Sequence, residues 1–349
     1  MNWENKNLTY NNLYLHRFKL YSETRGCVLV HNVGKMSYEM GLKMKSQLML
    51  VCFGLALSLC SSVAQSKEFK LFVLGGQSNM NGFGYNQDLP KNLNKPIDGV
   101  YIFQGHSDAD DAPIAGQGKW EVLQPGHGIG FSSNGKVNKH SDRFGVELSF
   151  AHKLRILYPN DNIAIIKYAR SGSSIAIEAA GPAGAWDPDY KGKTGVNQYD
   201  HFLNTLVNAR NNMDIDADGI PDRVTPKGII WMQGESDAGY TENLAKAYYA
   251  NLKRLMDLFR ATLLVDDLPV VIGKISDSWD NEVGKVWPFG ELVQYAQEKF
   301  VKEDSNAAIV RETRYYQYSD TWHYDSAGYI DLGDKFAEAV FELNKDKAE

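Results

Sequence analysis

Short apolar runs alternate with amphipathic segments along most of the sequence after residue 66. Five runs are mostly rich in Val and Ile and bounded by Gly, Pro, Asp or Ser, as buried parallel strands are: 69–74, 162–168, 228–232, 268–275 and 307–310. Four segments repeat apolar side chains at spacings of three and four, as helices do: 147–158, 243–263, 288–301 and 328–343. This alternation predicts an α/β fold around a central, mostly parallel sheet.

Two long stretches, 81–142 and 178–198, are rich in Gly, Pro, Asp and Asn and show neither pattern. Loops of this length inside a compact domain are usually functional or disordered. Ligands bind parallel sheets at the carboxyl ends of the strands, so we expect the functional residues just after the apolar runs. We expect one catalytic domain over residues 67–345.

Residues 44–64 have the pattern of a secretory signal peptide. Lys45 precedes an apolar run over 48–59, and small residues ending in Ala64 follow it. Signals begin at the start codon, so we expect Met44 to be the true start and 1–43 an over-extended gene model. The mature protein is then exported, either periplasmic or secreted. The run is too short to span a bilayer comfortably, and we expect no membrane span in the mature chain.

Net charge and composition limit the classes of partner that the protein is expected to bind. The net charge of −6 argues against nucleic acid as the main partner. Aromatic residues make up 12% of the chain, which slightly favours a sugar-binding surface. All three cysteines precede the expected cleavage, so the mature chain would have none.

A serine follows the first apolar run. Gly75 and Gly76 precede Gln77 and Ser78, where a sharp turn can present the hydroxyl. A serine hydroxyl is a weak nucleophile and needs a base and donors for the developing oxyanion. The alternative is a Gly-rich turn in which the serine is a cap.

The end of the chain supplies a base. Asp320 and His323 lie after the last predicted strand and before the C-terminal helix. A carboxylate three residues before a histidine can hold the imidazole tautomer and stabilise the imidazolium. The two motifs together favour a serine hydrolase.

Three blocks in order carry a family resemblance: 76–80 (Gly-Gln-Ser-Asn-Met), 231–237 (Trp-Met-Gln-Gly-Glu-Ser-Asp) and Asp320-x-x-His323. They resemble the SGNH hydrolase superfamily, in the branch of sialate O-acetylesterases and acetylxylan esterases. The resemblance implies a three-layer α/β/α, flavodoxin-like fold. It also implies metal-independent ester hydrolysis, typically deacetylation of carbohydrates, with no cofactor required.

The resemblance also implies roles for individual residues. Ser78 is the nucleophile, His323 the base and Asp320 its orienting acid. The backbone amides of Ser78 and Gly172 form the oxyanion hole. Gln233 stands where the wider superfamily has an asparagine donor, and its amide can replace that group. Glu235 is either a second acid that assists the histidine or a buried carboxylate bonded to backbone amides.

Further residues near these blocks are weaker candidates for substrate contacts: Gln77, Asn79, His127, Arg143, Trp186, Tyr190 and Tyr199. The loop aromatics could stack on a sugar ring or pin the loop to the core. His127 and Arg143 could line the mouth of the site.

An acidic repeat suggests a separate cation site. Asp214, Asp216, Asp218 and Asp222 with Gly219 match the start of a calcium loop. The twelfth position is Thr225 rather than the bidentate Glu of an EF-hand. The repeat is therefore either a structural Ca²⁺ site or a solvated acidic turn.

These observations predict an exported serine esterase that hydrolyses O-acetyl or similar short acyl esters on carbohydrates. Two alternatives stay open. One is a non-catalytic glycan-binding relative, and the other is an esterase or lipase acting on non-carbohydrate acyl esters.

Overall fold

The central sheet of the computed structural model has seven strands, and the structure describes residues 65–345 except 109–114, 193–195 and 283. The strand order is β11-β10-β9-β1-β8-β3-β4. All neighbours pair in parallel except β4, which is antiparallel to β3. The strands are β1 (Glu68–Gly76), β3 (Val100–Gln104), β4 (Glu121–Val122), β8 (Asn162–Ala169), β9 (Arg223–Met232), β10 (Val270–Gly273) and β11 (Ala307–Val310).

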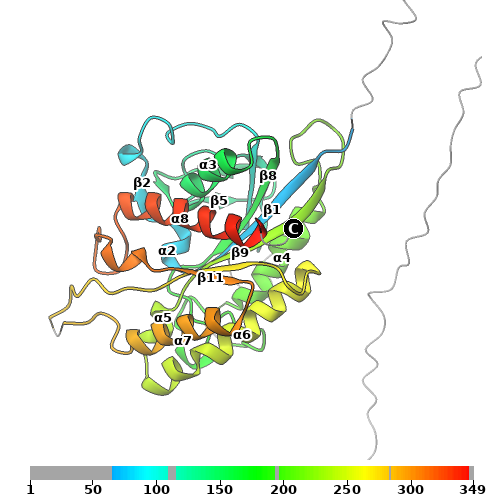
Figure 1. Ribbon diagram of the computed structural model, residues 1–349. Helices are drawn as coiled ribbons and strands as arrows, with labels where there is room; N and C mark the ends of the chain where they lie inside the picture. Colours follow the sequence, from blue (N-terminus) through cyan, green and yellow to red (C-terminus); the bar gives the residue numbers. More distant parts are fainter. Residues whose placement is uncertain (1–64, 109–114, 193–195, 283, 346–349) are drawn as a thin grey trace, which may run out of the picture. The chain divides into compact units, whose positions relative to one another are not determined.

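Helices cover both faces of this sheet (Figure 1). One layer holds α3 (Glu147–Leu157) and α8 (Ser326–Lys345), and the other holds α4 (Gln198–Arg210), α6 (Glu242–Leu263) and α7 (Gly290–Glu303). The rings of Phe202 on α4 and Phe259 on α6 stack with their centroids 4.0 Å apart. The expected α/β/α architecture with a mostly parallel sheet is confirmed.

Short elements complete the described chain. Two small antiparallel pairs are β2 (Gly84–Tyr85) with β7 (Arg143–Phe144), and β5 (Ser132–Ser133) with β6 (Asn138–Lys139). Single-turn helices are α2 (Ser78–Asn81), α5 (Glu235–Ala238), η1 (Asn86–Asp88), η2 (Ile177–Ala179) and η3 (Glu312–Tyr315).

The five strands and four helices expected from the sequence all form, with shifts at their ends. The expectation that 81–142 is irregular is wrong in part, because β3 lies inside this stretch and pairs with β8. The run Val-Tyr-Ile-Phe-Gln has strand character, but the Gly, Pro and Asp residues around it hide the signal. Helix α4 was also missed. The expected signal peptide and gene-model start lie outside the described residues.

The centre of the sheet sets the place of the functional site. The chain leaves β1 for β3 and β8 on one side, then returns to β9, β10 and β11 on the other. Gly76, the last residue of β1, is in register with Ala169 and Met232. The segments that follow β1, β8 and β9 therefore begin side by side at a topological switch point.

Among the described residues, no helix is both long and apolar enough to cross a membrane.

Candidate active site

The nucleophile candidate sits on a tight corner at the end of β1. Gly76 has φ +148°, and a Cβ on it would lie 2.0 Å from the carbonyl oxygen of Met232, so only glycine fits this approach. The N–H of Gln77 donates to that same carbonyl at 2.9 Å. Helix α2 starts at Ser78, which is only 6% exposed to solvent. The Gly-Gly pair thus turns the chain directly from the sheet into the site.

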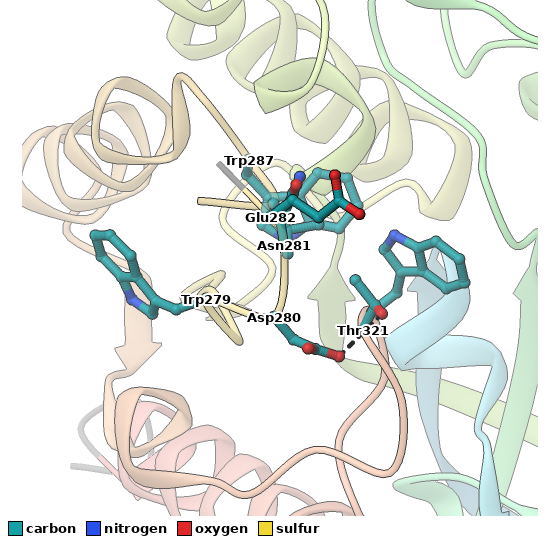
Figure 2. A pocket seen from close by; sticks show the side chains of 8 residues that line it. Trp279, Asp280, Asn281, Glu282, Trp287 and Thr321 are labelled. Atoms are coloured by element: carbon teal, nitrogen blue, oxygen red, sulfur yellow. Dashed lines mark hydrogen bonds between the residues drawn. The ribbon is translucent and has the colours of Figure 1, made fainter. Parts of the chain in front are cut away.

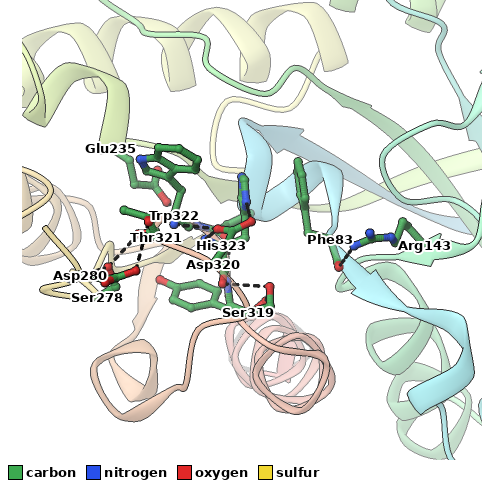
Figure 3. A network of polar contacts seen from close by, with 12 residues as sticks. Phe83, Arg143, Glu235, Ser278, Asp280, Ser319, Asp320, Thr321, Trp322 and His323 are labelled. Carbon is green, nitrogen blue, oxygen red and sulfur yellow. Dashed lines mark hydrogen bonds and ion pairs between the residues drawn. The ribbon is translucent and has the colours of Figure 1, made fainter.

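Asp320 orients His323. Its Oδ2 lies 2.8 Å from His323 Nδ1, and its Oδ1 accepts the backbone N–H groups of Trp322 and His323 at 2.8 Å each (Figure 3). Partial burial acts to raise the pKa of Asp320, but these hydrogen bonds outweigh it and hold that pKa below its ordinary value. With Nδ1–H donated to Asp320, Nε2 carries the lone pair that a general base needs.

The imidazole is also held from its face. The rings of Phe83 and His323 stack with centroids 3.6 Å apart and planes within 5° (Figure 3). Arg143 Nη1 donates to the carbonyl oxygen of Phe83 at 2.9 Å, and its guanidinium lies 3.6 Å from the centre of the Tyr85 ring. Arg143 therefore supports the residue behind the histidine.

Asn79 joins the serine and histidine segments. Its Nδ2 donates to the carbonyl oxygen of Trp322 at 3.3 Å, and its Oδ1 accepts the backbone N–H of Tyr324 at 3.4 Å. The hydroxyl of Tyr329 donates to the same Oδ1 at 2.8 Å. The residue after Ser78 thus contacts both chain neighbours of His323, which brings the two motifs to one face of the sheet.

Glu235 contacts Asn79. Its Oε1 accepts Asn79 Nδ2 at 2.8 Å, and its Oε2 has no hydrogen-bond partner among the described residues. Burial raises the pKa of Glu235 above its ordinary value. The carboxylate on His323 Nδ1 is that of Asp320, so the geometry favours the buried-carboxylate role of Glu235 over direct assistance to the histidine.

Gln77 and Gln233 tie the corner to the end of β9. Gln77 Oε1 accepts Gln233 Nε2 and the backbone N–H groups of Gly234 and Ser236 at 3.1–3.3 Å. Gln233 Nε2 also donates to Asp237 Oδ2 at 2.7 Å and lies 3.2 Å from the carbonyl oxygen of Ser173. The Gln233 amide is buried, and both of its N–H groups are used in these hydrogen bonds. This geometry therefore leaves it no free N–H for an oxyanion. The buried Gln77 side chain likewise joins the end of β1 to the segment after β9.

The segment after β8 completes the site. Gly172 is exposed with φ +78°, a conformation that favours glycine. Its neighbour Ser171 accepts a hydrogen bond from Asn81 Nδ2 at 3.2 Å, so the segment lies against α2. The buried Asp237 fixes it from the other side by accepting the N–H groups of Ile175 and Ala176 at 2.9 Å each. Asp237 was missed because only the fold reveals these partners.

Comparisons with known proteins identify the family of the chain. Residues 68–342 match the family model described as carbohydrate esterase, sialic acid-specific acetylesterase. The chain belongs to this family. It is therefore a carboxylic ester hydrolase of the acetylesterase type. Among curated proteins, none matches the sequence.

Solved structures with the same fold are distant in sequence. A protein from Arabidopsis thaliana shares 20% identity at a TM-score of 0.54, covering 80% of the esterase and 99% of that chain. A carbohydrate acetylesterase from Xanthomonas citri shares 19% at 0.53, covering 78% and 56%. NanS shares 16% at 0.51, covering 81% and 100%.

Several expected substrate contacts are wrong for this esterase. Trp186 is buried in the core, donates Nε1–H to Ser173 Oγ at 2.9 Å and packs its ring 5.0 Å from Trp231. Tyr190 and Tyr199 are also buried. Their burial holds the loop against the core, and the Tyr199 hydroxyl is hydrogen-bonded to Thr262 Oγ1 at 3.3 Å.

His127 does not line the mouth of the site. It is fully buried, and its Nδ1 lies 3.0 Å from Gln104 Oε1. Burial lowers the pKa of its imidazole. Its backbone carbonyl accepts Lys167 Nζ at 2.8 Å.

The acidic repeat forms a cluster away from these residues. Oxygens of Asp214, Asp216 and Asp218 lie within 4.8 Å of one another. The ammonium of Lys67 binds Asp216, and it binds Asp218 at 2.7 Å. Asp222 is not part of the cluster, because its two oxygens accept backbone N–H groups of Lys67 and Ile215 at 3.0 Å.

Proposed function

We propose that this esterase removes O-acetyl groups from carbohydrates through a Ser-His-Asp acyl-enzyme mechanism. One observation carries the proposal. Asn79, adjacent to Ser78, bonds to both residues that flank His323, and Asp320 holds the imidazole with its Nε2 free to accept a proton. These contacts support the proposal because they join the segments of the proposed nucleophile and base, which lie far apart in the sequence.

The reaction proceeds in two steps. His323 Nε2 takes the proton of the Ser78 hydroxyl as Oγ attacks the acetyl carbonyl, and the imidazolium then gives this proton to the departing sugar oxygen. In the second step the same imidazole deprotonates water, which attacks the acetyl-enzyme, and the imidazolium returns the proton to Ser78 Oγ as acetate is released. Asp320 stabilises the imidazolium in both steps through its 2.8 Å contact with Nδ1.

The oxyanion is stabilised by backbone amides of Ser78 and Gly172. Both belong to segments that start at the aligned ends of β1 and β8. Gly172 lies next to Ser171, which is bonded to α2. Losing one such donor typically costs about 3–4 kcal/mol of transition-state stabilisation. Gln233 does not serve as a third donor, because its amide N–H groups are hydrogen-bonded within the protein.

A cavity beside the catalytic segment supports a sugar substrate. Its volume is about 710 Å³, and Figure 2 shows its lining: Trp279, Asp280, Asn281, Glu282, Val286, Trp287, Thr321 and Trp322. Trp279 and Trp322 are 60% and 51% exposed. Exposed indole faces stack on the apolar faces of sugar rings, and carboxylates accept hydrogen bonds from sugar hydroxyls. The ring centroids of Trp322 and His323 are 6.3 Å apart, so a sugar that stacks on Trp322 would lie near the proposed base.

Acetate release from a panel of acetylated glycans tests the proposal. We expect the wild type to release acetate and Ser78→Ala to fall to background, with an unchanged circular dichroism spectrum. Labelling by a fluorophosphonate should modify the wild type at Ser78, whereas a glycan-binding relative without catalysis would not react. Wild-type-like turnover by Ser78→Ala would overturn the mechanism.

We also propose that the protein is exported, on the signal-like pattern of residues 44–64. N-terminal sequencing of the mature protein should begin after Ala64. A mature chain that retains residues before Met44 would contradict this.

A further inference from the structure

A second constellation lies in the long stretch between β3 and α3, outside the proposed catalytic machinery. Ligand atoms of Glu121, His127 and His140 all lie within 4.8 Å of one another. Glu121 is on β4, His127 follows in the next loop, and His140 comes directly after β6. Three separate turns of the chain thus direct one carboxylate and two imidazoles at a common point.

The buried histidine has an unpartnered nitrogen at that point. His127 Nδ1 lies 3.0 Å from the amide oxygen of Gln104, an acceptor, so Nδ1 carries the proton and Nε2 carries the lone pair. Nε2 is 3.4 Å from Glu121 Oε1 but makes no hydrogen bond within the described part of the chain. A buried lone pair facing a carboxylate oxygen is unfavourable unless a proton or a metal cation lies between them.

The distances suit a small divalent ion. His140 Nε2 is hydrogen-bonded to Glu121 Oε1 at 2.9 Å, a contact that an ion would replace, and His127 Nε2 is 3.4 Å from the same oxygen. Ligands about 2.0–2.1 Å from a tetrahedral ion lie about 3.3–3.4 Å apart, so small adjustments would place all three at bonding distance. The Gln104 contact on His127 Nδ1 has the form of the outer hydrogen bond that orients metal-bound histidines.

Neighbouring contacts hold the ligands in place. The His127 ring stacks on Phe131 with centroids 4.8 Å apart, and Asn138 Nδ2 donates to Glu121 Oε1 at 2.7 Å. His140 is partly exposed, which leaves an entry path and room for water as a fourth ligand. A ligand set of two imidazoles and one carboxylate favours Zn²⁺ or a similar metal ion over Ca²⁺ or Mg²⁺.

We propose that Glu121, His127 and His140 form a zinc site that fixes this stretch of chain to the sheet. The site is linked to the catalytic face through the backbone of His127. Lys167 Nζ donates to the carbonyl oxygens of His127 and of Asn81, the last residue of α2, at 2.8 and 2.9 Å. Zinc thus stabilises the loop packed behind the helix that carries Ser78, and it takes no part in ester cleavage.

Zinc titration of chelator-stripped full-length protein tests this proposal. We expect one Zn²⁺ per chain by calorimetry, and a rise in Tm of about 5 °C when free Zn²⁺ exceeds the Kd by 100-fold. X-ray absorption of the zinc-loaded protein should show two imidazole ligands. His140→Gln and Glu121→Gln should each abolish the stoichiometric binding and the Tm rise. Both positions are partly exposed, so these variants should still fold.

Two control variants separate this site from other zinc ligands. His152→Gln, on α3, and Asp218→Asn, in the acidic cluster, should bind zinc like the wild type. Absence of zinc binding in the wild type would overturn the proposal. So would binding that survives in His140→Gln and Glu121→Gln, or that is lost in Asp218→Asn.

Discussion

The side-chain amide of Asn79 donates a 2.8 Å hydrogen bond to Glu235 across 156 positions of sequence, in the buried floor of the site. The same amide reaches the carbonyl oxygen of Trp322, next to His323. Glu235 thereby positions Asn79, and Asn79 positions the histidine segment. Asn79, next to Ser78, thus contacts the segment that carries the proposed base, and we expect it to act through that segment rather than through the substrate.

The first prediction concerns Glu235→Gln. Glutamine can keep the acceptor for Asn79 and place a neutral amide where the unpartnered Oε2 lies. We therefore expect kcat close to the wild type. A residue that assisted His323 by its charge would instead lower kcat by about 100-fold or more on this change. Initial rates on an acetyl ester distinguish the two roles, and Glu235→Ala, which removes the shorter of the two hydrogen bonds that Asn79 Nδ2 donates, should lower both stability and kcat.

Glu235 also gives a pH dependence of stability. Burial raises its pKa in the folded protein above the ordinary 4.5. As pH rises past 4.5, the unfolded chain releases a proton that the folded chain retains, so the wild type loses stability with increasing pH relative to Glu235→Gln. Urea unfolding of both proteins from pH 4 to 8 should show this divergence, and parallel curves would contradict it.

Replacing Asp320 by Asn should remove the partner that fixes the His323 tautomer. The Asn amide can present an N–H to Nδ1, which then favours the tautomer with the proton on Nε2. We expect kcat to fall on the order of 10³–10⁴-fold, as in other serine triads. Asp98→Asn, at an exposed aspartate before β3, is the matched control and should keep wild-type rates. A small loss in Asp320→Asn would mean that another group orients His323.

Trp279→Ala should weaken sugar binding in the cavity beside Trp322. The side chain is 60% exposed, so its loss removes a stacking surface rather than core packing. We expect KM for an acetylated sugar to rise about tenfold, equal to about 1.4 kcal/mol, with a smaller effect on an aryl acetate. Tyr295→Ala removes an exposed ring on α7 outside the cavity lining and serves as the control. Equal effects of both substitutions on KM would argue against a sugar site in the cavity.

Calcium binding at the acidic cluster stays a prediction, and Lys67 makes it testable. The lysine ammonium binds Asp216 and Asp218 where an ion would sit, so calcium must displace it. We expect weak affinity, with a Kd of about 10⁻⁴–10⁻³ M, as in extracellular calcium modules. Lys67→Met should tighten binding in a calorimetric titration. No calcium heat from either protein would remove this site.

Local patterns were enough for the fold and for part of the site. Strands such as β1 and β8 carry their own apolar signal, because a strand buried on both faces is apolar along most of its length. Asp320 and His323 are three residues apart, so their contact forms within one turn. Residues 100–104 escaped notice because a single short strand among loop-forming residues has no repeating pattern to mark it.

The sequence by itself determined the α/β order of elements, the glycine corner before Ser78 and the Asp320–His323 pair, since each depends on residues that are close along the chain. Only the tertiary structure decided that Gln233 is a buried connector, that Trp186 is core and that His127 meets Glu121. These assignments depend on partners brought together from distant segments. The physical reason is that a polar or aromatic side chain acquires its role from the groups that surround it after folding, and the spacing of residue types does not encode those groups.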